Sequence, residues 1–236
     1  MTPTLGLYGI QDRQDHARPM ETHDHGLCLT AAGEVVWALE LERLTRRKHD
    51  NHLPRHLDEL LRPGDAALPG DFRVALVDSF VGRSFVSTRG LWRFEPNGRW
   101  HLSSRLQRGH GHVHHRDVET WLVPHELAHL GACLPFYGNF EEGALCVHID
   151  GGASRSNVSV WLHRERRLHK LHSSWRLFEA VTNFANNNLV QAMTGHAWFE
   201  HQAVPGKLMA LASYGHPEPE VRAWLRHHGW FRDIRG

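Results

Sequence analysis

The sequence predicts a mixed α/β fold, and three observations carry this prediction. Short apolar runs rich in β-forming residues, such as 73–80 and 144–149, are typical of buried strands. The stretch 53–61 has its apolar residues at helical spacing and is followed by a Pro-Gly pair, so it is typical of an amphipathic helix. Several strand-like runs precede each helical stretch, which favours a layered α/β domain.

The order of these elements predicts the architecture more closely. Strands are expected at 5–10, 26–30, 34–41, 73–80, 144–149, 157–162 and 168–171, and helices at 53–61, 124–134, 177–193 and 221–228. The polar stretch 82–117 is read as a long excursion. Three strands before a helix, begun twice, predict a duplicated actin-like/ribonuclease-H-like ATPase (ASKHA) fold. Residues 1–140 would form the first lobe, with a metal-binding helix, and 141–236 the start of an incomplete second lobe.

Composition limits the classes of partner. The 236 residues are 41% hydrophobic, enough for one good core or two small lobes, and the net charge is +1. This balance predicts neither a nucleic-acid nor a membrane partner. The chain start does not resemble a signal peptide, and no apolar run approaches the ~18 residues of a membrane span. Three widely spaced cysteines are interpreted as buried free thiols of a cytoplasmic protein.

His125 and His129 form the sharpest local motif, because two histidines four positions apart lie on one helix face and can share a metal ion. With Glu126 the same string reads H-E-x-x-H, so a zinc metallopeptidase is an alternative, with Glu141 or Glu142 as third ligand. Pro124 counts against this alternative, since it places both histidines in the first turns of the helix. That position favours anionic ligands near the site.

Three further strings are candidate binding elements. Asp150, Gly151 and Gly152 follow a predicted strand, where a carboxylate and open backbone N–H groups suit a metal and a phosphate, or simply a tight turn. Lys207 follows Pro-Gly and has the charge to meet a phosphate, or lies in an ordinary loop. The charged run 40–50 reads either as a solvated strand end or as a grip on a carboxylate or phosphate.

Taken together, these strings resemble the N-terminal domain of the NodU/CmcH/TobZ carbamoyltransferases. The run 40–50 (ELERLTRRKHD) is similar to that family's E-E-E-R-L-T-R-x-K-H-D and is the most specific match. The strings 23–29, 125–129, 144–151 and 207–215 resemble H-D-x-S-A-A-L, H-H-x-A-H, A-L-x-x-x-I-D-G and K-L-M-G-L-A-S-Y-G in the same order. The resemblance therefore covers nearly the whole chain.

The resemblance implies an actin-like domain that works with a separate YrdC-like domain or subunit. That partner makes carbamoyl-adenylate from ATP and carbamoyl phosphate, and the carbamoyl group is then moved to a hydroxyl of a small-molecule or sugar acceptor. Carried over by position, His125, His129 and Asp150 would bind a divalent metal, iron or zinc. By the same resemblance, the acceptor hydroxyl would lie near His23, Asp24 and Arg43, and nucleotide phosphate near Gly151, Gly152 and Lys207.

The chain also departs from the family pattern. Glu126 replaces the second histidine of the metal motif, and Ala210 replaces a glycine. Residues 11–22 look inserted, and the rest of the second lobe and the YrdC-like domain are expected to be missing, so the chain is expected not to complete the transfer alone. A non-catalytic actin-like binding module is the remaining alternative.

Overall fold

The computed structural model describes most of the chain in two compact units. The described residues are 2–9, 24–62, 67–79, 83–97, 105–150, 155–175, 210 and 213–227. The first unit consists of residues 1–141 and 153–155, and the second of 142–152 and 156–236. Each unit is described by itself.

The first half of the sheet in the first unit contains a three-stranded meander and two strands parallel to its first strand. Strand β1 (Thr4–Tyr8) pairs antiparallel with β2 (Gly26–Ala31), and β2 pairs antiparallel with β3 (Glu34–Glu40). On the other side, β1 pairs parallel with β4 (Arg73–Val77), which pairs parallel with β8 (Arg116–Val123). The predicted hairpin is confirmed, and Ala32 and Gly33 in its turn both have positive φ, as tight hairpins require.

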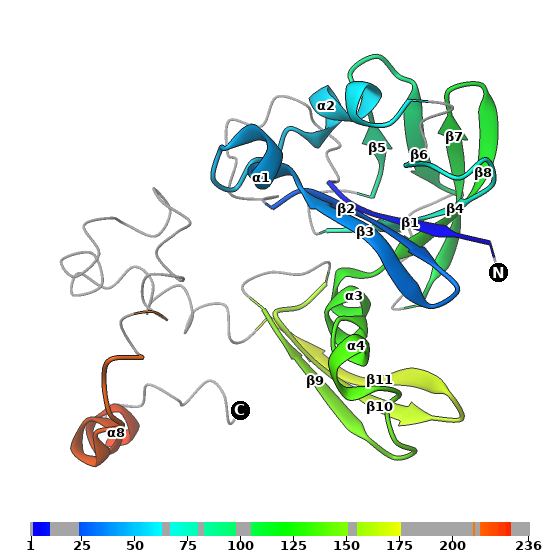
Figure 1. The fold of residues 1–236 in the computed structure, drawn as a ribbon. Coiled ribbons are helices and arrows are strands. Elements are labelled where there is room, and N and C mark those ends of the chain that lie inside the picture. Colours follow the sequence, from blue (N-terminus) through cyan, green and yellow to red (C-terminus); the bar gives the residue numbers. More distant parts are fainter. Residues whose placement is uncertain are drawn as a thin grey trace. The chain divides into compact units, whose positions relative to one another are not determined.

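The stretch 82–117, expected to be an excursion, instead extends this sheet. It contains β5 (Phe85–Val86), β6 (Trp92–Pro96) and β7 (Gln107–Val113), and the full strand order is β3-β2-β1-β4-β8-β7-β6-β5 (Figure 1). Buried Trp92 and Phe94 alternate with more exposed neighbours in β6, a period of two that is typical of a half-buried strand. Polar and glycine-rich composition hid this signal.

Among the described residues of the first unit there are four helices. They are α1 (Leu41–Thr45), α2 (Leu53–Leu60), α3 (His125–Gly131) and α4 (Leu134–Tyr137). The helix predicted over 124–134 ends earlier than expected, at Gly131. Pro135 explains this break, because it has no N–H to donate to the carbonyl of Gly131.

The core of the first unit lies between the sheet and helix α2. Leu53 and Leu57 of α2 are fully buried and belong to one cluster with Leu5 and Leu7 of β1. Trp92, also fully buried, joins the same cluster from β6. Burial of large apolar side chains is the dominant stabilising term, at about 1.5–3 kcal/mol for each.

The second unit contains an antiparallel sheet and one described helix. Strand β10 (Val158–Arg164) lies between β9 (Leu145–Ile149) and β11 (Arg167–Ser174), close to the predicted strand positions. Helix α8 (Pro219–His227) corresponds to the helix predicted at 221–228, whereas the helix predicted at 177–193 lies outside the described residues. The chain is thus a mixed α/β protein.

The three cysteines are free thiols, as expected, but only Cys146 is buried. Cys28 and Cys133 are half-buried, which corrects the prediction that all three are buried. Cys28 lies between Leu27 and Leu29 on β2 and therefore faces away from the core that these leucines join. Its partial burial still raises the pKa of the Cys28 thiol.

Among the described residues, no helix combines the length and apolar character needed to cross a membrane.

Candidate metal centre

The candidate site lies at the carboxyl ends of the three parallel strands. Tyr8 ends β1 and is paired in register with Val77 of β4, which is paired in turn with Val123 of β8. Asp78 follows β4 directly, and Pro124 and His125 follow β8. Because carboxyl ends of adjacent parallel strands meet at one edge, this is the edge where open α/β sheets bind ligands.

Asp78 holds the start of helix α3. Its Oδ1 accepts the backbone N–H of His125 at 3.0 Å, and its own N–H donates to the carbonyl of Val123 at 2.9 Å. Pro124, the residue before the helix, makes no side-chain capping bond. The carboxylate of Asp78 therefore does the work of a helix cap from a neighbouring strand.

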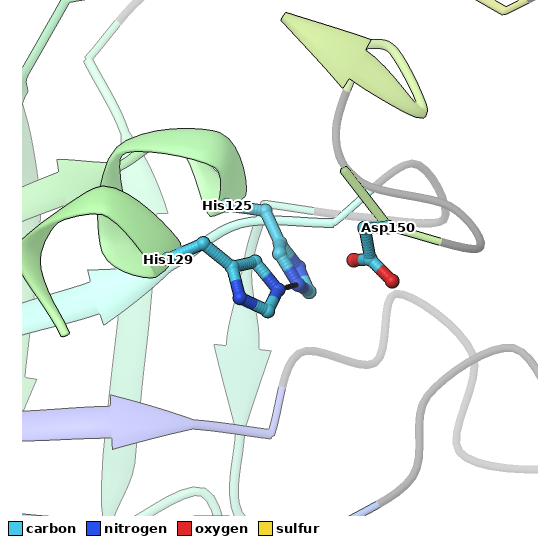
Figure 2. Close-up of side chains that lie close together, drawn as sticks. All are labelled: His125, His129 and Asp150. Atoms are coloured by element: carbon cyan, nitrogen blue, oxygen red, sulfur yellow. Dashed lines mark hydrogen bonds between the residues drawn. The ribbon is translucent and has the colours of Figure 1, made fainter. Parts of the chain in front are cut away.

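His125 and His129 turn the same ring nitrogen toward each other from consecutive turns of α3. Their Nε2 atoms are 2.9 Å apart, and the ring centroids are 4.8 Å apart (Figure 2). The ring of Tyr8 meets the His125 ring edge-on, with centroids 5.5 Å apart. Packing by Tyr8 and the backbone bond from Asp78 thus fix His125 from two sides.

The two nitrogens fit a metal ion. Bonds of about 2.0–2.1 Å from each nitrogen to a tetrahedral metal place the nitrogens about 3.3 Å apart. The observed 2.9 Å is a few tenths of an ångström shorter, within reach of small side-chain rotations. When no metal is bound, one ring donates its Nε2–H to the Nε2 of the other. To bind a metal through both Nε2 atoms, the donor ring would carry its proton on Nδ1, so that both ligands are neutral imidazoles.

Two buried arginines that the sequence analysis did not single out meet the carboxylate of Asp78. Arg83 Nε lies 3.4 Å from Asp78 Oδ2, and Arg155 Nη2 lies 3.7 Å from the same oxygen. The side chains of Arg83 and Asp78 are each 4% exposed, and that of Arg155 is 9% exposed. Neither arginine belongs to a motif or a regular spacing, so only the fold reveals them.

Glu126 is also buried, and its Oε1 accepts the backbone N–H of Arg155 at 2.8 Å. This bond ties the chain at Arg155 to helix α3. A metallopeptidase would need the Glu126 carboxylate as a general base beside a metal-bound water. Its structural hydrogen bond gives no support to that alternative.

The structure brings Asp24 to His49, a residue to which the sequence analysis assigned no role. Asp24 Oδ1 lies 2.8 Å from His49 Nδ1, and both residues have positive φ. Donor atoms of Asp24, Glu42 and His49 lie within 4.8 Å of one another. Glu42 already accepts the backbone N–H of His49 at 3.0 Å, and each of its oxygens lies 3.2 Å from Lys48 Nζ.

These bonds set the electrostatics around Glu42. The His49 N–H, followed by Lys48, holds the pKa of the Glu42 carboxyl below its usual value despite its burial. The Lys48 ammonium lies 3.2 Å from both oxygens of Glu42, so this carboxylate of the trio is already paired with a cation. Arg43, predicted near the acceptor, is exposed and pairs with Glu40 at 3.1 Å.

Asp50 is a buried carboxylate that supports the start of helix α2. Its Oδ1 accepts the backbone N–H of His52 at 2.9 Å and lies 2.7 Å from His52 Nδ1. Burial by itself would raise the pKa of Asp50, but hydrogen bonds from Thr45 and His52 outweigh burial and lower it.

We expect Asp50→Asn to cost less stability in acid than at neutral pH. Because the folded-state pKa of Asp50 lies below the ordinary value of about 3.9, the charged carboxylate stabilises the protein above that pH. This stabilisation is lost as pH falls through the folded-state pKa. Urea unfolding at pH 6 and at pH 3 measures the free energy of unfolding of the wild type and of Asp50→Asn. The difference between the two proteins should be smaller at pH 3. Asp71→Asn, at an exposed position, is the control, and an Asp50→Asn difference that stays constant with pH would contradict this assignment.

Of the remaining predicted site residues, the structure describes Asp150 and does not describe the other four. Asp150 follows β9 directly (Figure 2). Its backbone N–H donates to the carbonyl of Asn157 at 2.9 Å. His23 of the first unit lies outside the described residues, and so do Gly151, Gly152 and Lys207.

No protein-family model matches the chain, and no curated protein matches it at a significant level.

Proposed function

We propose that this chain is the actin-like catalytic domain of a carbamoyltransferase. It would move a carbamoyl group, through carbamoyl-adenylate, to a hydroxyl of a small-molecule or sugar acceptor, with ATP and a divalent metal. The observation that carries the proposal is the His125–His129 pair, whose ring nitrogens converge at the carboxyl ends of three parallel strands.

The sheet of the first unit supports the fold part of the proposal. Three antiparallel strands, β1 to β3, precede a helix, in the order expected for an actin-like lobe. The next two core strands, β4 and β8, are added parallel to β1, and this creates an edge where a nucleotide and a metal can bind. The strands β7, β6 and β5 continue the sheet sideways from β8.

The metal would be iron or zinc, held by the imidazoles of His125 and His129. By the family resemblance, Asp150 would be the third ligand. A bound ion would supply Lewis-acid polarisation of a carbonyl or phosphoryl oxygen. The protein's own part is to hold the ligands, through the Asp78 bond to His125 and the packing of Tyr8.

Other residues are assigned from the family resemblance alone. His23, Asp24 and Arg43 would lie near the acceptor hydroxyl, and Gly151, Gly152 and Lys207 near nucleotide phosphate. The donor, carbamoyl phosphate, would be activated on a YrdC-like domain or subunit. A non-catalytic binding module is the competing class, and it predicts a folded protein without metal or nucleotide affinity.

Nucleotide binding separates these two classes. We expect the metal-loaded chain to bind ATP, and we expect the affinity to fall at least about tenfold when a chelator removes the metal, because a bound cation stabilises phosphate charge. Isothermal titration of metal-loaded and stripped protein measures both values. The variant His56→Ala, which removes a histidine from helix α2, should bind ATP as the wild type does. A folded chain that binds neither the metal nor ATP would instead identify a binding module.

A further inference from the structure

We infer that Arg83 and Arg155 form a binding site for a phosphoryl oxyanion at the carboxyl end of β4. Neither residue lies in a string that carries the family resemblance, and the site needs no metal. The inference therefore goes beyond the proposed function and does not depend on the His125–His129 pair.

The side chains of Arg83 and Arg155 share one carboxylate oxygen of Asp78. Both guanidinium groups approach Asp78 Oδ2, at 3.4 Å and 3.7 Å, distances longer than a well-formed charged hydrogen bond of about 2.7–2.9 Å. Asp78 Oδ1 is engaged by the N–H of His125. One buried carboxylate therefore serves two guanidinium groups and a helix start, and its Oδ2 lies beyond close hydrogen-bond range of Arg155 Nη2.

Two side-chain nitrogens of Arg155 lack a hydrogen-bond acceptor among the described residues. Its Nε and Nη1 atoms are buried from solvent and have no hydrogen-bond partner among the residues that the structure describes. These two nitrogens carry three N–H donors, and a buried donor without an acceptor costs roughly 1–3 kcal/mol. A ligand oxygen is the acceptor that would remove this cost.

A second buried carboxylate, that of Glu126, also contacts Arg155. Its Oε1 accepts the Arg155 backbone N–H at 2.8 Å, so that oxygen serves the main chain of Arg155. With Glu126 and Asp78 both ionised, the four charges of the cluster cancel. The case for a ligand therefore rests on unmet N–H donors and on long ion-pair distances, and not on an excess of positive charge.

The chemistry of the donors selects the ligand. Two planar guanidinium groups that approach the same carboxylate oxygen match an anion that presents several oxygens, and arginine forks bind phosphoryl groups in this way. The location at the carboxyl end of a parallel strand is also where phosphorylated ligands bind in open α/β sheets. The phosphoryl group can come from a nucleotide, from carbamoyl phosphate or from inorganic phosphate.

The test uses the full chain stripped of metal, so that its failure is separate from failure of the metal proposal. Inorganic phosphate, ATP and carbamoyl phosphate are titrated one at a time, with calorimetry and with nitrogen-15 spectra of the arginine Nε–H groups. Arg155→Lys keeps the charge but removes the fork, Arg83→Gln removes the other fork, and exposed Arg108→Gln is the matched control. The Arg155 signal is identified by its loss in Arg155→Lys.

We expect inorganic phosphate to bind and to shift the Nε–H signal of Arg155, with affinity reduced at least about tenfold in Arg155→Lys and Arg83→Gln and unchanged in Arg108→Gln. A preference for ATP or carbamoyl phosphate over inorganic phosphate would name the source of the group. The inference is overturned if about 20 mM inorganic phosphate, a concentration on the order of the weakest useful Kd, does not shift the Arg155 signal of the folded wild type. It is also overturned if folded Arg155→Lys binds phosphate as the wild type does. Should Arg83→Gln fail to fold, the spectra of the wild type and Arg155→Lys decide. Should Arg155→Lys fail to fold, the Arg155 signal is assigned in the wild type by triple-resonance spectra, and its response to phosphate decides.

Discussion

Replacing His125 by alanine should abolish stoichiometric binding of iron or zinc. Only two imidazoles of α3 converge on the site, with their Nε2 atoms 2.9 Å apart, so loss of one removes half of the nitrogen ligands. Even changes in residues that merely orient metal ligands cost about 10- to 100-fold in affinity, so loss of a ligand should cost at least about 100-fold. His129→Ala should have the same effect, and the double variant should be no worse than either single variant.

Metal content per chain, measured after dialysis against a weak chelator, checks this expectation. Exposed His110 and His112 on β7 offer an adventitious site, so the comparison is made in a His110→Ala/His112→Ala background. His56→Ala on α2 controls for removal of a helical histidine. If His125→Ala keeps the metal content and affinity of the background protein, the assignment of the metal centre is wrong.

Replacing Asp78 by alanine should destabilise the protein by about 3–5 kcal/mol, because it leaves two buried arginines without their shared carboxylate. It also removes the acceptor of the His125 N–H. Glu40→Ala, which breaks an ion pair with exposed Arg43, should cost no more than about 1 kcal/mol.

Urea unfolding of the three proteins measures both values. Asp78→Asn separates the contributions, since the amide oxygen still accepts from His125 but carries no charge. We expect Asp78→Asn to retain part of the lost stability. A cost for Asp78→Ala as small as that for Glu40→Ala would show that the arginine cluster does not stabilise the first unit.

Local signals in the sequence were sufficient for the elements near the site. The turn at Ala32–Gly33, between two β-forming runs, predicted the β2–β3 hairpin. Pro124 predicted the start of the helix that carries His125 and His129. The four-residue spacing of the two histidines predicted that both lie on one helix face. These predictions succeed because turn chemistry and helical periodicity are properties of short segments.

Long-range features were not predictable in this way. Arg83 and Arg155 meet at Asp78 only because of the arrangement of β4 and of the chain around residue 155, and no spacing connects them. The strand at Trp92–Pro96 was predictable in principle, since Trp92 and Phe94 alternate with polar residues. The histidines, glycines and arginines around it lowered the apolar content and concealed that pattern.

X-ray absorption at the metal edge of the loaded protein shows whether His125 and His129 bind one metal ion together. The account predicts scattering from two imidazole rings with metal–nitrogen distances of about 2.0–2.1 Å, and loss of one ring in His129→Ala. A spectrum without imidazole scattering, or one unchanged by His129→Ala, would contradict it.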